Sequence, residues 1–213
     1  EMGEARRRLV FDELLRIQLA LVQRKVDLER TSVGIAHDVG ATALLDEFRS
    51  GLGFQMTTAQ DRVVDEILAD LARPAPMHRL LQGDVGSGKT VVAVAAMLVA
   101  VQGGHQAAVM VPTEVLAEQH HTTIAGLLDA MTVSDPATLL GHRPLKVDLL
   151  TSSTTAGERR RIGSELLAGG VDVLIGTHAL IQEGVEFGSL GVVVIDEQHR
   201  FGVEQRAALR DKN

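Results

Sequence analysis

The sequence predicts an α/β fold of three layers, in which helices cover both faces of a mostly parallel sheet. Two observations from residue 78 onward predict this class. Short runs of four to six apolar residues are continuous rather than alternating, which is typical of strands buried on both faces. Most of these runs are separated by amphipathic stretches long enough for a helix, and parallel strands need such crossover connections. A helical segment of roughly 75 residues is expected to precede this domain.

The first predicted element is one long helix over residues 5–29. Val10, Leu14, Ile17 and Leu21 recur three and four residues apart, so they share one face of this helix. We expect the apolar stripe that they form to pack against the domain that follows.

Shorter elements follow along the chain. A second helix is expected over residues 43–49, and a third from a capping threonine, Thr57 or Thr58, to Leu71. We then expect strands over residues 78–82, 107–111, 147–150, 171–175 and 192–195. Helices are expected over residues 89–101, 114–128 and 157–167, and a surface loop over residues 131–146.

Composition excludes several classes of protein. The 213 residues include 21 Lys plus Arg and 28 Asp plus Glu, and this net charge of −7 argues against a basic module that coats DNA by bulk charge. Cysteine is absent, which excludes disulfides, thiolate metal sites and a Cys nucleophile. Trp and Tyr are absent too, so a nucleic-acid site of stacked aromatic rings is not expected. No apolar run is long enough for a bilayer and no signal peptide is visible, so we expect a cytoplasmic protein without membrane contact.

A glycine-rich segment carries the strongest local signal. It matches the pattern G-x-x-x-x-G-K-T and lies between an apolar run and an Ala/Val-rich helix, as a phosphate-binding loop requires. Its backbone N–H groups and the start of the helix would bind phosphate, Lys89 would reach the β- and γ-phosphates, and Thr90 would bind Mg²⁺. The expected nucleotide-binding residues of this loop are Gly83, Asp84, Val85, Gly86, Ser87, Gly88, Lys89 and Thr90.

Two carboxylates at the end of the last predicted strand form the second signal. Asp196 and Glu197 follow the apolar run 192–195, at the edge of the sheet where ligands of open α/β folds bind. We expect Asp196 to bind Mg²⁺ together with Thr90, and Glu197 to orient and deprotonate the attacking water. Lys89, Asp196 and Glu197 are therefore the predicted catalytic residues of a nucleoside triphosphatase that uses ATP and Mg²⁺.

Further motifs resemble those of superfamily 2 helicases. Residues 196–199 are similar to the DExH box. The resemblance implies that Gln198 and His199 couple the nucleotide to neighbouring parts of the motor. Residues 54–60 resemble the adenine-reading motif, with Gln60 in the reading position, where an amide both donates and accepts. Segments after two strands match the first lobe's nucleic-acid motifs, which implies DNA-backbone contacts by Pro112, Thr113, Gly176, Thr177 and His178.

Longer runs resemble one helicase family more closely. Residues 82–90 and 196–206 are similar to the RecG family of ATP-dependent DNA helicases, which remodel branched DNA, Holliday junctions and stalled replication forks. The resemblance implies that residues 1–52 are a helical linker from a wedge domain, and that residues 53–213 are the first RecA-like lobe of a P-loop NTPase. It also implies that the chain stops before the Thr-Ala-Thr motif. The expected partners are branched DNA, the wedge domain and a second lobe, and the expected oligomeric state is a monomer. Without that second lobe, we expect little ATP hydrolysis.

Alternatives remain at this point. A transcription–repair coupling translocase shares the phosphate loop and the Arg-Phe-Gly-Val run at residues 200–203. A non-catalytic P-loop binding module is also open, whereas a transporter ATPase would carry a Leu-Ser-Gly-Gly-Gln-like run that this sequence lacks.

Some of the selected residues also have plainer interpretations. Thr113 and Thr177 fit a role as helix caps. The arginines at residues 159–161 and 6–8 fit solvated helix faces. His120 and His121 show no carboxylate partner at a ligand spacing, so no metal site other than that for nucleotide-bound Mg²⁺ is expected.

Overall fold

A four-stranded parallel sheet forms the centre of the computed structural model, which describes residues 2–31, 33–210 and 212. Its strands are β1 (Gln106–Met110), β4 (Val147–Leu150), β5 (Val173–Gly176) and β6 (Leu190–Ile195), in the order β4-β5-β1-β6. All three neighbouring pairs are parallel. The parallel sheet predicted from the continuous apolar runs is therefore confirmed.

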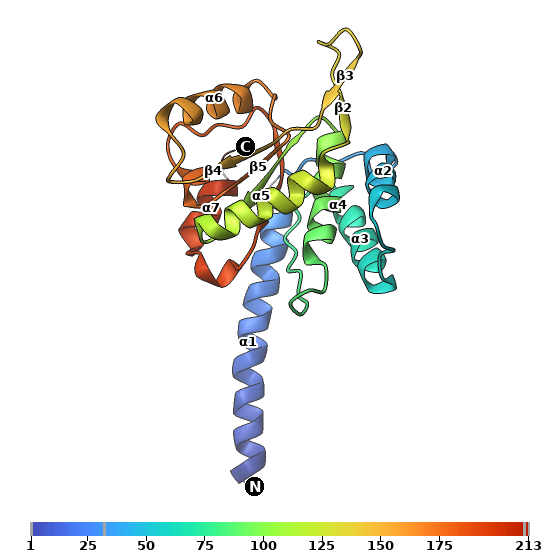
Figure 1. The fold of residues 1–213 in the computed structure, drawn as a ribbon. Coiled ribbons are helices and arrows are strands. Elements are labelled where there is room, and N and C mark those ends of the chain that lie inside the picture. The colour runs from blue at the N-terminus through green and yellow to red at the C-terminus, as the bar shows by residue number, and fades with distance from the viewer. Residues whose placement is uncertain (1, 32, 211, 213) are drawn as a thin grey trace.

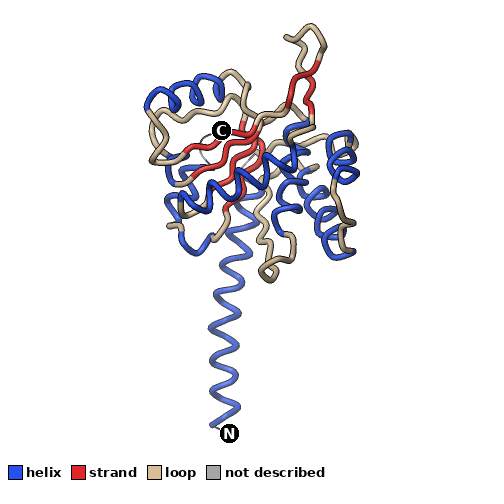
Figure 2. The backbone as a smooth tube through the Cα atoms, viewed as in Figure 1, coloured by secondary structure: helices blue, strands red, loops and turns tan. Residues whose placement is uncertain are grey.

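Helices cover both faces of this sheet (Figure 1 and Figure 2). On one face lie α4 (Lys89–Gln102) and α5 (Glu114–Leu128), with α2 (Ala43–Gly51) and α3 (Thr58–Leu71) packed against α4 from outside. On the other face lie α6 (Ala156–Leu167), the 3₁₀ helix η1 (His178–Ile181) and α7 (Val203–Arg210). The predicted three layers are confirmed.

Alternation along β1 explains why the sheet has a core on each side. Ala107 and Val109 belong to the core shared with α2, α3, α4 and α5. Ala108 and Met110 belong to the second core, to which α6 contributes Ile162 and Leu166. Because both sets of side chains are buried, the sequence of β1 from Ala107 onward is a continuous apolar run and does not alternate between apolar and polar residues.

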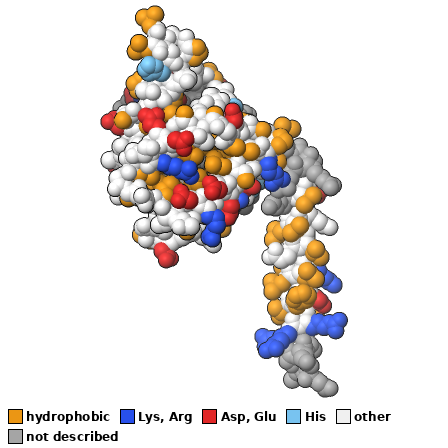
Figure 3. Space-filling view, turned by 90° about the vertical axis from the view of Figure 1, so that its right-hand side faces the viewer, with side chains coloured by type: hydrophobic (Ala, Val, Ile, Leu, Met, Phe, Trp, Pro, Cys, Tyr) orange, Lys and Arg blue, Asp and Glu red, His pale blue; other side chains and the backbone are white. Residues whose placement is uncertain are grey.

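The long helix α1 (Met2–Thr31) is formed as predicted, but the expectation that it packs on the lobe is wrong. Leu9, Phe11, Leu14 and Ile17 are each more than half exposed, and Figure 3 shows hydrophobic side chains along the projecting helix. Periodicity predicts that a helix forms, but it does not specify which partner covers it. No helix in the described part of the chain combines the length and apolar character needed to cross a bilayer.

The predicted strand over residues 78–82 is not formed. Residues 78–82 have no regular secondary structure and no ladder partner, and Leu80 is 64% exposed. Arg79 instead bonds to Asp70 and Glu66 on α3. An apolar pair in an extended segment makes a strand only when a neighbouring strand supplies hydrogen bonds.

Residues 131–146 are not simply a loop, which corrects the sequence interpretation. They contain an antiparallel hairpin of β2 (Thr132–Ser134) and β3 (His142–Pro144), which projects from the lobe in Figure 1. Arg143 fixes the base of the hairpin through two hydrogen bonds to the carboxylate of Asp172, at 2.6 and 2.9 Å. The strands are three residues long, too short for a period-two pattern to stand out in the sequence.

A pair of histidines joins the segment after α1 to the start of the sheet. His37 is buried and its ring meets that of His105 edge to face at 5.1 Å. Burial lowers the pKa of His37, the nearby His105 lowers it further, and burial also lowers the pKa of His105. Both rings therefore favour the neutral form more strongly in the folded chain than in the unfolded one.

This pair predicts a loss of stability in mild acid. An unfolded histidine takes up a proton below about pH 6.5, before the folded one does, so the stability present at neutral pH is lost as the pH falls through that value. We expect a lower urea midpoint at pH 5.5 than at pH 7.5. The difference should shrink in a His37→Gln/His105→Gln double variant, and an equal difference in both proteins would contradict the assignment.

Candidate functional site

The carboxyl edge of the sheet gathers the residues singled out in the sequence. Residues 103–105 connect the end of α4 to the start of β1, so these two ends lie together at the amino edge of the sheet. The first turn of α4, with Lys89, therefore lies at the opposite, carboxyl edge. Thr113 follows β1 at this edge, Thr177 follows β5, and Asp196 follows β6. In Figure 1 the loop before α4 lies at the lower side of the lobe, away from the hairpin.

The phosphate-binding loop is tightly curled. Gly86 and Gly88 both have φ of +79°, a conformation that glycine adopts at little cost. The Lys89 ammonium donates to the carbonyl oxygens of Gly83 and Asp84, both at 2.8 Å. The side chain therefore lies back over its own loop, in the space that the loop encloses.

Gln60 connects the start of α3 to this loop. Its Oε1 accepts from the Thr57 N–H at 2.8 Å, and Thr57 Oγ1 accepts from the Gln60 N–H, which completes a capping box. Its Nε2 donates to the Ser87 carbonyl oxygen at 2.9 Å. A Cβ at Gly88 would lie 2.3 Å from this Nε2, so a larger residue there would displace the Gln60 amide, in addition to the strain that the positive φ of Gly88 imposes on it. One N–H and one lone pair of the amide remain for a ligand.

Asp196 is held from two directions. Its Oδ1 accepts from the Glu197 N–H and its Oδ2 bonds to His120 Nε2, both at 2.9 Å. His120 lies on α5, 76 residues earlier in the sequence, so the expectation that it has no carboxylate partner is wrong. The sequence did contain a signal for this contact. His120 is seven residues, or about two helical turns, after Thr113, so it lies on the same face of α5 as a residue of the carboxyl edge.

Glu197 lies in a strained turn. It has φ of +52°, and among the described residues it is the one non-glycine with positive φ. Such a conformation costs about 1–3 kcal/mol and is typical of functional sites. It places Glu197 just before the 3₁₀ helix η2 (Gln198–Arg200), with His199 Nδ1 at 3.4 Å from its Oε2 and both side chains exposed.

The residues at this edge fit a magnesium ion bound to a nucleotide. Each Asp196 oxygen accepts one hydrogen bond, which leaves lone pairs for a metal or its waters. Within the described ranges no three His, Asp or Glu side chains group as metal ligands. Mg²⁺ in nucleotide sites uses one or two protein oxygens and takes the rest from phosphates and water, so the oxygen donors of Asp196 and Thr90 would be enough to hold it.

The predicted DNA contacts separate into exposed and buried residues. Thr113 and His178 are exposed and Pro112 is half-buried, whereas Gly176 and Thr177 are buried. The plainer interpretation of the threonines as caps is confirmed. Thr113 Oγ1 accepts from the Leu116 N–H at 3.3 Å, and Thr177 Oγ1 accepts from the Ala179 N–H at 3.5 Å. Of the five residues predicted to contact DNA, Thr113 and His178 are therefore exposed to solvent and Pro112 is partly so.

The arginines at residues 159–161 are largely engaged within the lobe. Arg161 donates to Glu158, Asp148 and Glu165. These contacts raise the pKa of Arg161, and Arg161 in turn lowers the pKa of Glu158. Arg159 donates to the Thr151 carbonyl oxygen and to the Gln182 side chain. These contacts favour the interpretation as a solvated, internally paired helix face.

A cavity of about 580 Å³ lies beside the start of α3. Asp61, the residue after Gln60, lines it, as does Phe54, whose side chain is 54% exposed. The other residues that line it are Arg49, Ser50, Leu52, Gly53, Gln55 and Met56. It therefore adjoins the residue that contacts the phosphate loop.

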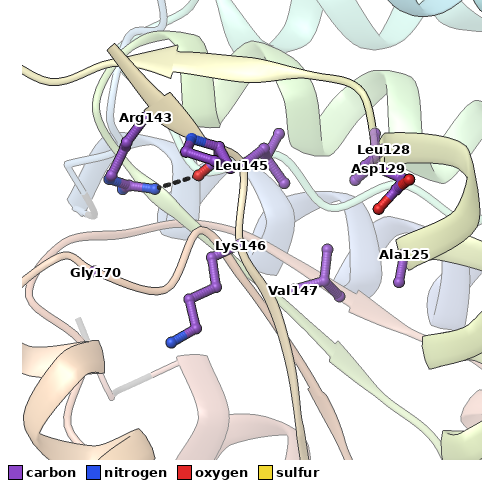
Figure 4. A pocket seen from close by; sticks show the side chains of 9 residues that line it. Ala125, Leu128, Asp129, Arg143, Leu145, Lys146, Val147 and Gly170 are labelled. Atoms are coloured by element: carbon purple, nitrogen blue, oxygen red, sulfur yellow. Dashed lines mark hydrogen bonds between the residues drawn. The ribbon is translucent and has the colours of Figure 1, made fainter. Parts of the chain in front are cut away.

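A second cavity, of about 450 Å³, lies between the end of α5 and the base of the hairpin (Figure 4). Leu128, Arg143 and Lys146 are among the residues that line it. Because α5 ends and β4 begins there, this cavity lies at the amino edge of the sheet, away from the phosphate loop.

Comparisons with known proteins agree with this arrangement. The family model described as DEAD/DEAH box helicase matches residues 57–212. The ATP-dependent DNA helicase RecG of Synechocystis sp. is 51% identical over an alignment of 215 positions, which covers 100% of this chain and 24% of the relative. RecG of Bacillus subtilis is 48% identical over 209 residues, 98% of this chain and 29% of the relative. The chain thus spans about a quarter of the length of these relatives.

Two solved structures are similar to this chain. The first, "Structure of RecG bound to three-way DNA junction", has a TM-score of 0.81 and 43% identity, and the match covers 94% of this chain and 26% of that chain. The yeast DEAD-box splicing factor Prp28 has a TM-score of 0.55 and 17% identity, over 85% of this chain and 43% of that chain. The second similarity shows the fold alone.

Proposed function

The chain belongs to the DEAD/DEAH box helicase family, and from this membership we propose that it is the ATP-binding motor lobe of a DNA helicase that acts on branched DNA. The observation that supports this most strongly is the placement of the phosphate loop, Asp196 and Glu197 at the same, carboxyl edge of the sheet. The RecG names of the relatives, and the three-way junction in the similar structure, favour branched DNA in recombination and repair over a transcription-coupled translocase.

We assign the nucleotide to the carboxyl edge. Phosphate oxygens replace the Gly83 and Asp84 carbonyls as partners of Lys89, while the N–H groups of the loop and the first turn of α4 bind the remaining phosphate oxygens. The cavity beside Phe54 and Asp61 accepts the base, and the free N–H and lone pair of Gln60 suit the paired edge of adenine.

Hydrolysis in this proposal depends on two carboxylates. Thr90 and Asp196 bind the metal ion, which supplies positive charge to the phosphate oxygens. Glu197 orients the attacking water and accepts its proton, and the strained turn fixes its backbone for this role. Gln198 and His199, which are exposed on η2, are placed to report the nucleotide state to another part of the motor.

DNA is proposed to lie across the exposed residues that follow β1 and β5. Thr113 is the N-cap of α5 and His178 is the first residue of η1, so both lie where a helix begins and could approach a phosphate backbone. Backbone contacts suit a motor that moves along any sequence. Gly176 and Thr177 then support this surface from beneath rather than touch the DNA.

The remaining domain and partner assignments are also proposals. Residues 1–52 would link a wedge domain to the lobe formed by residues 53–213, and a second lobe would complete the ATPase site. Such an enzyme would act as a monomer on DNA in the cytoplasm.

Replacing Lys89 tests the nucleotide site. We expect Lys89→Ala to weaken binding of a fluorescent ATP analogue at least about tenfold, because it removes the one side-chain cation of the loop. Fluorescence titration measures the dissociation constant. Lys146→Ala is the matched control, because it removes the same charge at the amino edge of the sheet, where Lys146 pairs with Glu165. Equal affinities for the wild type and Lys89→Ala would overturn the proposed site.

A further inference from the structure

We propose that His120 is a positioning residue for the metal-binding carboxylate of Asp196. The proposal rests on the proposed nucleotide site, and it adds a residue from α5 that no motif of that site contains. Its basis is the bond between His120 Nε2 and Asp196 Oδ2 at 2.9 Å, which joins α5 to the end of β6.

The geometry leaves Asp196 little freedom. Its backbone N–H donates to the Met110 carbonyl oxygen at 3.0 Å, which continues the β1–β6 ladder to this residue. Its two carboxylate oxygens are then held separately, one by the Glu197 N–H and the other by His120. The direction in which the remaining lone pairs point is therefore set jointly by the main chain and by His120.

The hydrogen bond also fixes the chemistry of the imidazole. A carboxylate oxygen only accepts, so the hydrogen lies on His120 Nε2 and the ring is the donor. This arrangement orients Asp196 without placing the imidazole among the metal ligands, and Mg²⁺ prefers oxygen donors to imidazole. His120 thus acts through Asp196.

Burial distinguishes this contact from an incidental surface pair. The His120 side chain is 18% exposed and that of Asp196 is 38% exposed, whereas the nearby His199–Glu197 pair is 71% and 48% exposed with a longer separation of 3.4 Å. A partly buried pair is less screened by solvent and salt, so it holds its geometry better. Residues that orient metal ligands in this way typically change metal affinity by about 10–100-fold when they are removed.

The test separates metal binding from nucleotide binding. A fluorescent ATP analogue is titrated into the chain in EDTA, and then at fixed nucleotide concentration with increasing Mg²⁺. We expect His120→Leu to bind the analogue in EDTA as the wild type does, but to need about tenfold more Mg²⁺ for half of the metal-dependent gain in binding. A change in folding alone would alter both titrations.

Two conservative variants make the test specific. The Gln side chain places a donor near the position of His120 Nε2, whereas the Asn side chain is too short to reach Asp196. We therefore expect His120→Gln to keep the wild-type Mg²⁺ dependence and His120→Asn to shift it as His120→Leu does. This comparison between two polar variants stands even if His120→Leu folds poorly.

The neighbouring histidine provides a matched control. His121 is on the same helix, but its Nε2 lies 3.4 Å from the Val147 carbonyl oxygen, so His121→Leu should leave the Mg²⁺ dependence unchanged. A wild-type Mg²⁺ dependence in both His120→Leu and His120→Asn would overturn the role of His120 alone. Failure of the wild type to bind the analogue in either buffer would instead overturn the proposed function.

Discussion

Gly176→Ala is expected to lower the free energy of unfolding by about 3 kcal/mol, near the upper end of the usual cost of overpacking a core. A Cβ at this position would lie 2.1 Å from the Leu150 carbonyl oxygen and 3.0 Å from Leu180 Cδ2. The first contact is with the backbone of β4, which pairs with β5 at this point and cannot move aside as a side-chain end could. Urea unfolding followed by circular dichroism measures the change.

Gly126→Ala is the matched control for this substitution. Gly126 is exposed inside α5 and a Cβ there meets nothing within 4 Å. Alanine at such a helical position should raise stability by about 0.5–1 kcal/mol. If Gly176→Ala were as stable as the wild type, the close packing of β4 on β5 described here would be wrong. A large cost would explain glycine at position 176 by sheet packing, without a contact to DNA.

Arg143→Met is expected to lower the free energy of unfolding by about 3 kcal/mol, the lower end of the range for a broken buried ion pair. Asp172 is buried, and Arg143 bonds to both of its oxygens and to the Gly169 carbonyl oxygen. The Asp172 carboxylate raises the pKa of Arg143, so the guanidinium stays charged. Methionine would leave the carboxylate with the Lys146 N–H as its remaining described partner.

An exposed pair provides the comparison. Arg49 lies 3.8 Å from Asp61, and both side chains are more than about one third exposed, so Arg49→Met should cost less than about 0.5 kcal/mol. Adding Asp172→Asn to Arg143→Met should recover part of the loss, because the buried charge is then removed. Equal unfolding midpoints for Arg143→Met and Arg49→Met would show that the hairpin base does not depend on this pair.

Regular elements could be predicted because local pattern determines them. The apolar runs at residues 107–111 and 192–195, and the threonine cap of α3, each have a physical signature within a few residues. The segment 78–82, the hairpin and the packing of α1 could not be predicted in the same way. Each depends on a partner elsewhere in space, which periodicity does not reveal.

The candidate site shows the same division. Loop glycines and the paired carboxylates follow patterns that the chemistry of phosphate and metal imposes on adjacent residues. The contact between His120 and Asp196 joins positions 76 residues apart, and the burial of Thr177 depends on how η1 folds back. Such relations appear only once the sheet brings its carboxyl ends together.

Burial of α4 on every side has a mechanical consequence. Ten of its residues, from Val91 to Val101, are buried between the sheet and the outer pair α2 and α3. A helix packed in this way cannot slide or rotate without opening voids in a close-packed interior. A change at the phosphate loop is therefore expected to displace exposed segments, such as the turn at residues 197–200, while α4 stays in place.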